Sequence, residues 1–161
     1  MIDLILPTYN FSLFYAEKLV ADVPDERMAA QPVAGRVMNH AAFTLGHLAW
    51  ANDNGLALLG RQPTLADWKG RMGIGATPSD DRSLYPSKAV LLDALKDAHG
   101  RLATAVREAS PEALAQPGPE QMRRMFPTVG AMFVGLMTSH EGSHLGQLSA
   151  WRRAMGFPSV F

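Results

Sequence analysis

The sequence predicts an all-α protein, a bundle of four long helices. Apolar residues recur every three or four positions in four segments, about residues 8–22, 40–59, 87–109 and 129–155. Stretches rich in proline and glycine separate these segments, and no segment has the pattern of a strand. Four long helices without a strand pack most simply as a four-helix bundle.

A single domain, residues 1–161, is expected. A chain of 161 residues can bury enough apolar surface to fold without disulfides or a second domain. Its apolar share of 47% and charged share of 19% are those of a globular protein, which excludes disorder as the default. The sequence contains no internal repeat and no low-complexity tract.

The first helix is expected from about Thr8 to Asp22. Pro7 suits the first turn of a helix, and Pro24 cannot continue one. The residues with helical spacing, which we expect to pack inward, are Phe11, Phe14, Tyr15, Leu19 and Val20. A short helical turn and a loop then lead to the second helix.

The second helix is expected over residues 40–59, with Asn39 as its N-cap and Gly60 as its C-terminal stop. The next segment, residues 61–86, is too long for a structureless connection and is expected to be a packed functional loop or a crossover. Its large apolar residues are Trp68, Met72 and Tyr85. They either cover a pocket as a lid or, as we favour, pin the segment to the core.

The third and fourth helices have clear ends. Ser87 caps an amphipathic run that reaches about Ala109 and carries Val90 on its apolar face. Thr128 opens a last helix over about residues 129–155, which Gly156 ends.

Charge and cysteine content argue against several functional classes. Fifteen basic and fifteen acidic residues cancel, so no overall field attracts nucleic acid or an anionic membrane. The absence of cysteine excludes disulfides, thiolate zinc sites, iron–sulfur clusters and a cysteine nucleophile. The N-terminus lacks the features of a signal peptide and no apolar run could span a bilayer, so we expect a cytoplasmic protein. Zero net charge also makes a homodimer unsurprising.

Two histidines in the last helix have chelating spacing. His140 and His144 stand four residues apart, so both imidazoles project from one helix face within reach of a single ion. The alternative is a pair of solvated or core-edge histidines. The neighbouring Gly142, Ser143 and Gly146 leave space for a second helix or a ligand on that side.

His47 lies mid-helix, where a lone histidine is more often a hydrogen-bonded core residue than a ligand. Adding it to His140 and His144 would give three neutral nitrogen ligands and leave coordination positions for water or substrate, as catalytic metal sites do. Zinc and nickel both suit such a set.

Residues 140–144 also match H-E-x-x-H, in which the glutamate is the general base of a metalloprotease. The 17 residues after His144 contain no third ligand of the His, Glu or Asp type, which argues against that class. Glu141 is thus either a catalytic residue that leans toward metal-bound water or, as we slightly favour, a solvated charge at the bundle rim. His40 lies about 10 Å along the helix from His47, too far for the same ion, and His99 is expected at the surface.

These motifs resemble those of the DinB family. The resemblance covers nearly the whole chain and includes Asn10, TLGHL at residues 44–48, YPS at residues 85–87 and HxxxHLGQLxxWRRxxG at residues 140–156. It implies an up-down-down-up four-helix bundle with a long crossover between the second and third helices, and frequent homodimers. It also implies a divalent ion held at the positions of His47, His140 and His144.

Characterised members of that family include metal-dependent S-transferases and isomerases that use low-molecular-weight thiols such as bacillithiol or mycothiol. The expected function is therefore a metal-dependent enzyme, a transferase or hydrolase, whose ion activates a small thiol or water toward a small-molecule substrate. The main alternative is a non-catalytic metal-binding or interaction bundle.

Overall fold

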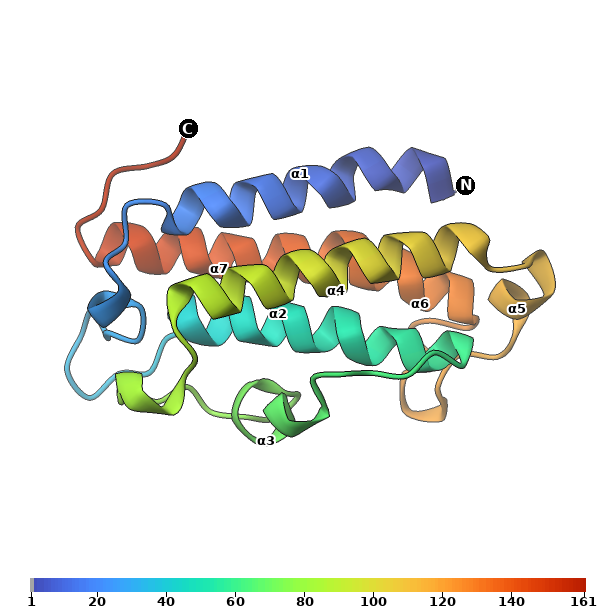
Figure 1. Ribbon diagram of the computed structural model, residues 1–161, viewed down its shortest axis with the longest axis horizontal. Helices are drawn as coiled ribbons and strands as arrows, with labels where there is room; N and C mark the ends of the chain where they lie inside the picture. The colour runs from blue at the N-terminus through green and yellow to red at the C-terminus, as the bar shows by residue number, and fades with distance from the viewer. Residues whose placement is uncertain (1) are drawn as a thin grey trace.

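Four long helical rods lie side by side in the computed structural model, which describes residues 2–161 (Figure 1). They are α1 (Ile2–Val20), α2 (Ala41–Gly55), α4 (Lys88–Glu108) and a rod that joins α6 (Val129–Gly135) to α7 (Glu141–Ala154) through a π turn (Leu136–His140). Among residues 2–161 there is no β-strand, only an isolated bridge between Pro117 and Thr128. The all-α class is confirmed.

The connections between the rods hold only short helices. These are α3 (Lys69–Met72), α5 (Pro111–Ala115) and 3₁₀ turns at Asp25–Arg27, Leu56–Leu59, Ala66–Trp68, Arg82–Leu84 and Glu120–Met122.

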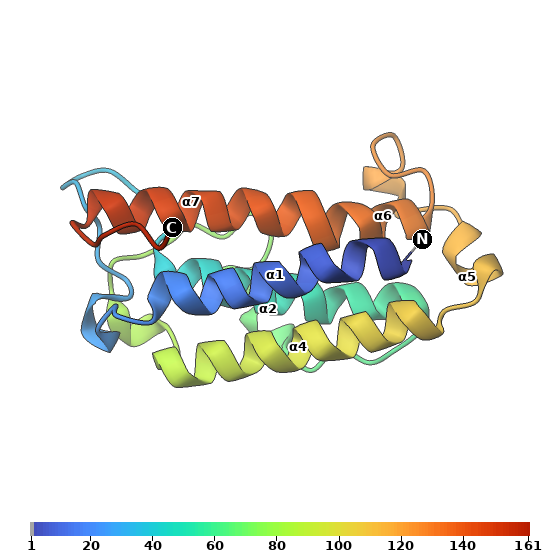
Figure 2. The same cartoon turned by 90° about the horizontal axis from the view of Figure 1, so that it is seen from above.

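The rods follow the up-down-down-up order that the DinB resemblance implies. In Figure 1, α2 and α4 run in the same direction and α1 and α7 run in the opposite one. Seen from above, α1 lies between α7 and α4 (Figure 2), and both α1 and α2 pack against α4 and α7. The parallel pair α2 and α4 requires the long crossover, which passes along the outside of α2 through α3 (Figure 1).

Helix α1 begins at Ile2, six residues before the expected start at Thr8, and continues through Pro7. Pro7 removes one helical hydrogen bond, but the carbonyl that loses its partner belongs to Asp3 at the exposed end of the helix. The expected inward packing of Phe11 and Phe14 is wrong, because they are 53% and 44% exposed. Phe11 instead stacks at the surface on Phe161, the last residue of the chain.

Helix α2 is capped one residue later than expected. The cap is His40, whose Nδ1 accepts the Phe43 N–H, while the expected cap, Asn39, donates to Gln147 on α7. Gly60 ends the following 3₁₀ turn in a left-handed conformation with φ of 69°, as its expected stop role requires.

The crossover is pinned to the core rather than laid over it as a lid. Met72 and Tyr85 are buried in the same hydrophobic cluster as the residues of α2. The buried carboxylate of Asp53 on α2 accepts the backbone N–H groups of Thr64 and Leu65, each at 2.8 Å. The favoured pinning interpretation is therefore confirmed for Met72 and Tyr85.

Helix α4 begins after Ser87, whose hydroxyl accepts the Val90 N–H as expected. Val90 itself is 50% exposed rather than buried. The expected surface position of His99 is wrong, because its ring is buried against Tyr9 of α1 at a centroid separation of 3.6 Å. His99 Nε2 donates to Asn10 Oδ1 at 3.1 Å, which gives the buried ring a partner on α1.

A layer of polar residues divides the core into two hydrophobic clusters. Three rods contribute a buried polar side chain to this layer, namely Asn52, His99 and Glu141, and the fourth contributes Tyr9, whose buried ring stacks on that of His99. In each rod, residues before and after this position belong to different clusters. For example, Leu48 of α2 belongs to one cluster, and Leu56, in the 3₁₀ turn that follows α2, belongs to the other. The layer thus lies near the middle of the bundle.

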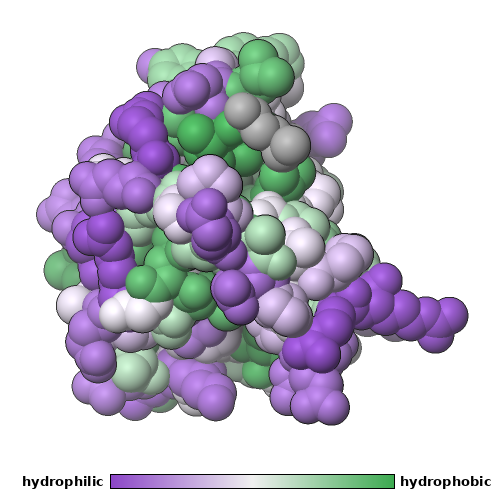
Figure 3. All heavy atoms as spheres, turned by 90° about the vertical axis from the view of Figure 1, so that its right-hand side faces the viewer, coloured by the Kyte–Doolittle hydropathy of each residue, from purple (hydrophilic) through white to green (hydrophobic). Residues whose placement is uncertain are grey.

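The surface is mixed in character. Figure 3 views the end of the bundle where α1 begins; hydrophilic side chains cover much of it and hydrophobic ones gather in its upper part, near the start of α1. Within residues 2–161, no helix has the length and apolar character to cross a bilayer.

The buried His99 predicts a pH dependence of stability. Burial lowers its pKa from 6.5 to about 4. Below pH 6.5 the unfolded chain therefore binds a proton that the folded chain does not, so stability falls as the pH falls toward 4. Between pH 7.5 and 5 we expect the wild type to lose on the order of 2 kcal/mol more than His99→Gln, measured by urea unfolding with chelator present. Equal losses would contradict a neutral, buried imidazole.

Candidate metal centre

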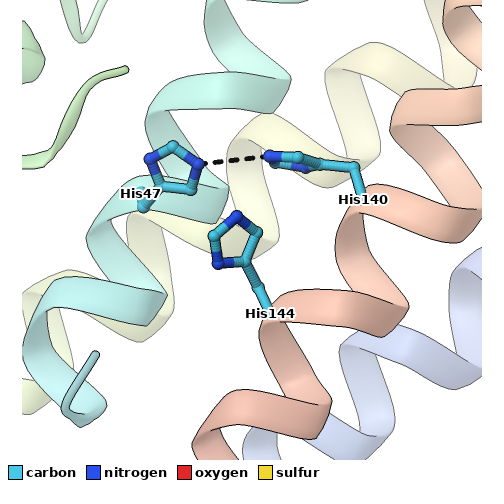
Figure 4. Close-up of side chains that lie close together, drawn as sticks. All are labelled: His47, His140 and His144. Carbon is cyan, nitrogen blue, oxygen red and sulfur yellow. Dashed lines mark hydrogen bonds between the residues drawn. The ribbon is translucent and has the colours of Figure 1, made fainter. Parts of the chain in front are cut away.

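His47 is held on α2 in the orientation that a metal ligand needs. It is 6% exposed, and its Nδ1 lies 2.7 Å from the backbone carbonyl oxygen of Met72 at the end of α3. A carbonyl can only accept, so Nδ1 carries the proton and donates it. The lone pair is then on Nε2, which points toward His140 and His144 (Figure 4).

The close approach of Met72 to His47 depends on the glycine next to the histidine. A Cβ atom at Gly46 would lie 1.9 Å from the Met72 sulfur, so no side chain fits there while Met72 stays in place. Met72 is 1% exposed, and its packing against Gly46 brings the end of α3 down onto α2.

The three histidines converge as the sequence and the family resemblance predicted. His140 ends the π turn and His144 lies one helical turn further along α7, and both rings point at His47 on α2 (Figure 4). One nitrogen from each ring lies within 4.8 Å of the other two, and the Nε2 atoms of His47 and His140 are 3.1 Å apart. Two imidazole nitrogens bound to one tetrahedral zinc ion lie about 3.3 Å apart, so the donor set fits a divalent ion.

All three imidazoles are neutral at physiological pH, as metal ligands must be. Burial lowers the pKa of His47, and it lowers that of His144 to about 4 together with the nearby His47. The pKa of His140 falls to about 3, because of burial and because charge on His144 or His47 would repel a charge there. Each neutral ring therefore keeps one nitrogen lone pair with which it can bind a metal ion.

The cluster is open on one side. His140 and His144 are only partly buried, so solvent reaches the cluster from their side. Within residues 2–161 the cluster includes no carboxylate, so the three imidazoles are its whole set of strong ligands. A site with three nitrogen ligands and an open side has room for water or a substrate.

Glu141 is buried in the core and does not lie at the bundle rim. It is 2% exposed, so the rim interpretation is wrong, and it lies outside the histidine cluster. Its Oε1 accepts a hydrogen bond of 2.9 Å from Asn52 Nδ2 in the buried polar layer. Burial raises the pKa of Glu141 to about 8, although hydrogen bonds from Asn52 and Ser12 oppose the rise, so the carboxyl is largely protonated at pH 7.

The two remaining histidines stay outside the centre. His40 caps α2 and its Nε2 lies 2.8 Å from the Ser79 carbonyl, so it holds the crossover and is separate from the cluster, as expected. His99 lies in the polar layer between α1 and α4.

The comparison with known families agrees with this geometry. A family model described as the DinB superfamily matches residues 15–148. The chain belongs to the DinB superfamily. No curated protein matches the sequence significantly. Superfamily membership and the histidine cluster are together compatible with a metal-binding protein.

Sequence reasoning missed two groups that support the site of this DinB-superfamily chain. The carbonyl of Met72 has no signature, because every residue carries one. The sequence indicates this contact only indirectly, through Gly46 in TLGHL, because a glycine in the middle of a helix usually has a packing reason. Asn52, the partner of Glu141, follows His47 by five residues on α2 and is one of several polar residues in that stretch.

Gly46 gives a direct test of how His47 is held. A Cβ at position 46 would push the buried Met72 side chain away from α2. We expect Gly46→Ala to weaken zinc binding by about tenfold, because a shift of the Met72 backbone with its side chain breaks the hydrogen bond that orients the imidazole. Gly146→Ala, on the exposed side of α7 where a Cβ meets nothing, should leave affinity unchanged. Competition with a chromophoric chelator measures both. Equal affinities in the two variants would show that the Met72 contact does not matter.

Proposed function

We propose that this protein is a metal-dependent enzyme, a transferase or a hydrolase, in which His47, His140 and His144 hold one divalent ion, zinc or nickel. The open side of a three-imidazole cluster carries the proposal. An ion bound there would supply Lewis acidity, which favours the thiolate or hydroxide form of a small nucleophile near neutral pH. DinB-superfamily membership supports a small thiol as that nucleophile.

The chain's own residues contribute binding and orientation. The Met72 carbonyl keeps the His47 proton on Nδ1, and burial keeps all three rings neutral. His140 and His144 are only partly buried, so a small substrate could approach the ion from their exposed side.

A metalloprotease mechanism is disfavoured by the position of Glu141. A general base must reach the attacking water, whereas this carboxyl is buried among Asn52 and the polar layer, and its raised pKa keeps it protonated near pH 7.

The metal site is tested by metal content and affinity. Wild-type protein purified without chelator is expected to carry about one divalent ion per chain, and His47→Ala, His140→Ala and His144→Ala to lose at least tenfold in affinity. His99→Gln, a buried histidine away from the cluster, is the matched control and should bind as the wild type does. Equal metal content in wild type and His144→Ala would overturn the proposal.

Reactivity is tested on protein loaded with cobalt, whose visible spectrum reports its ligands. A change in that spectrum on adding a small thiol supports the transferase form, and a change with small anions alone supports the hydrolase form. A spectrum that responds to neither indicates a closed site and a non-catalytic bundle.

We also propose that the protein is a homodimer, on the basis of the family resemblance and the zero net charge. Light scattering should give twice the mass of one chain. The mass of a single chain would reject the dimer and leave the metal site unaffected.

A further inference from the structure

Glu141 follows the ligand His140 directly, yet the two side chains face different surroundings. His140 points at His47, whereas Glu141 points into the core and meets Asn52. Both contacts join α2 to the rod that contains the π turn and α7. The rotation of α7 about its axis therefore decides both together.

The π turn sets this rotation. Phe133 is fully buried, and in an uninterrupted α-helix His140, seven residues later, would lie about 20° from it on the same core-facing side. The π turn at Leu136–His140 takes up about one extra residue, which turns the following helix back by roughly 100°. As a result Glu141 and Leu145 take the core-facing positions, and His140 and His144 move to the flank beside α2.

Hydroxyl side chains compensate for the irregular turn. Thr138 Oγ1 donates to the Val134 carbonyl at 2.6 Å, and Ser139 Oγ donates to the Gly135 carbonyl at 3.1 Å. Both acceptors belong to the last two residues of α6, immediately before the π turn, where the regular backbone pattern changes. The turn is thus supported by its own residues.

Apolar packing alone would specify this rotation weakly. The core residues of α7 on either side of the layer would tolerate some turning, because dispersion contacts have little directionality. The hydrogen bond from Asn52 to Glu141 is directional, and its groups are 0% and 2% exposed. Turning α7 away from this position would leave both buried polar groups without that partner, which is costly.

We propose that Glu141 is a positioning residue: its buried hydrogen bond with Asn52 fixes the rotation of α7 and so aims His140 and His144 at His47. This role rests on the proposed metal site. It assigns the glutamate of the H-E-x-x-H sequence a part in building the site through the helix rather than in reacting with substrate.

The decisive variant is the double substitution Asn52→Leu with Glu141→Leu. Replacing a buried polar pair by apolar residues often leaves stability equal or higher, so the protein is expected to unfold in urea at or above the wild-type midpoint with chelator present. Zinc affinity is nevertheless expected to fall by about tenfold or more, because nothing directional then holds α7. A loss of affinity without a loss of stability is not expected from a merely structural pair.

Two further variants complete the test. Glu141→Gln keeps an oxygen that accepts from Asn52 and should retain zinc affinity within about twofold of the wild type. His99→Leu breaks a different hydrogen bond of the polar layer, between α4 and α1. This variant should also retain zinc affinity within about twofold, since it leaves the α2–α7 contact intact.

The outcomes separate this inference from the function on which it rests. If the double variant binds zinc as tightly as the wild type, or if His99→Leu weakens binding equally, the positioning role is wrong and the metal site stands. If the double variant unfolds earlier than the wild type, the comparison passes to Glu141→Gln, and a tenfold loss there overturns the role. If the wild type itself binds no metal, the proposed function fails first.

Discussion

The contact between α2 and α7 is the constraint on which the rest of the structure depends. Two consecutive residues, His140 and Glu141, both contact α2, but in different places. His140 meets His47 at the flank of the bundle, and Glu141 meets Asn52 within the core. A regular helix that ran straight on from α6 would direct the first of them inward. The π turn, the hydroxyl groups of Thr138 and Ser139, and Asn52 are the features that allow the required rotation.

The crossover has a second role besides joining parallel helices. Its buried residues attach it to α2, and Asp53 anchors its first part through the backbone of Thr64 and Leu65. Met72 then brings one carbonyl oxygen to the ring of His47. A long connection that a bundle of this topology needs anyway thus becomes the outer support of the candidate metal centre.

The sequence predicts the helices and the three candidate ligands well, for physical reasons. Helical periodicity, the Ser87 and Thr128 caps and the Gly60 stop are local features, and the spacing of His140 and His144 is local too. His47 entered the prediction mainly through the family resemblance, because its approach to the pair depends on how two distant helices pack.

The predictions that fail depend on which way a side chain faces in the finished bundle. His99 has charged neighbours in the sequence and Glu141 is itself charged, so both are expected at or near the surface. In the folded bundle both are buried and hydrogen-bonded in the polar layer. Phe11 and Phe14 fail in the opposite direction, because α1 has more apolar residues than its buried face can hold. The π turn covers only Leu136–His140, which is too short to change the apolar periodicity of the sequence detectably.

The support of His47 by a main-chain carbonyl has a consequence for how related sequences can diverge. The oxygen at position 72 is available whichever residue stands there, so exchange of Met72 for a side chain of similar shape would keep the donor's partner. The sequence constraint falls instead on α2, where the absence of a side chain at Gly46 lets Met72 pack closely. Among homologues we therefore expect the residue at position 72 to vary, although its carbonyl makes the hydrogen bond. We expect position 46, which makes no hydrogen bond to the ring, to stay glycine.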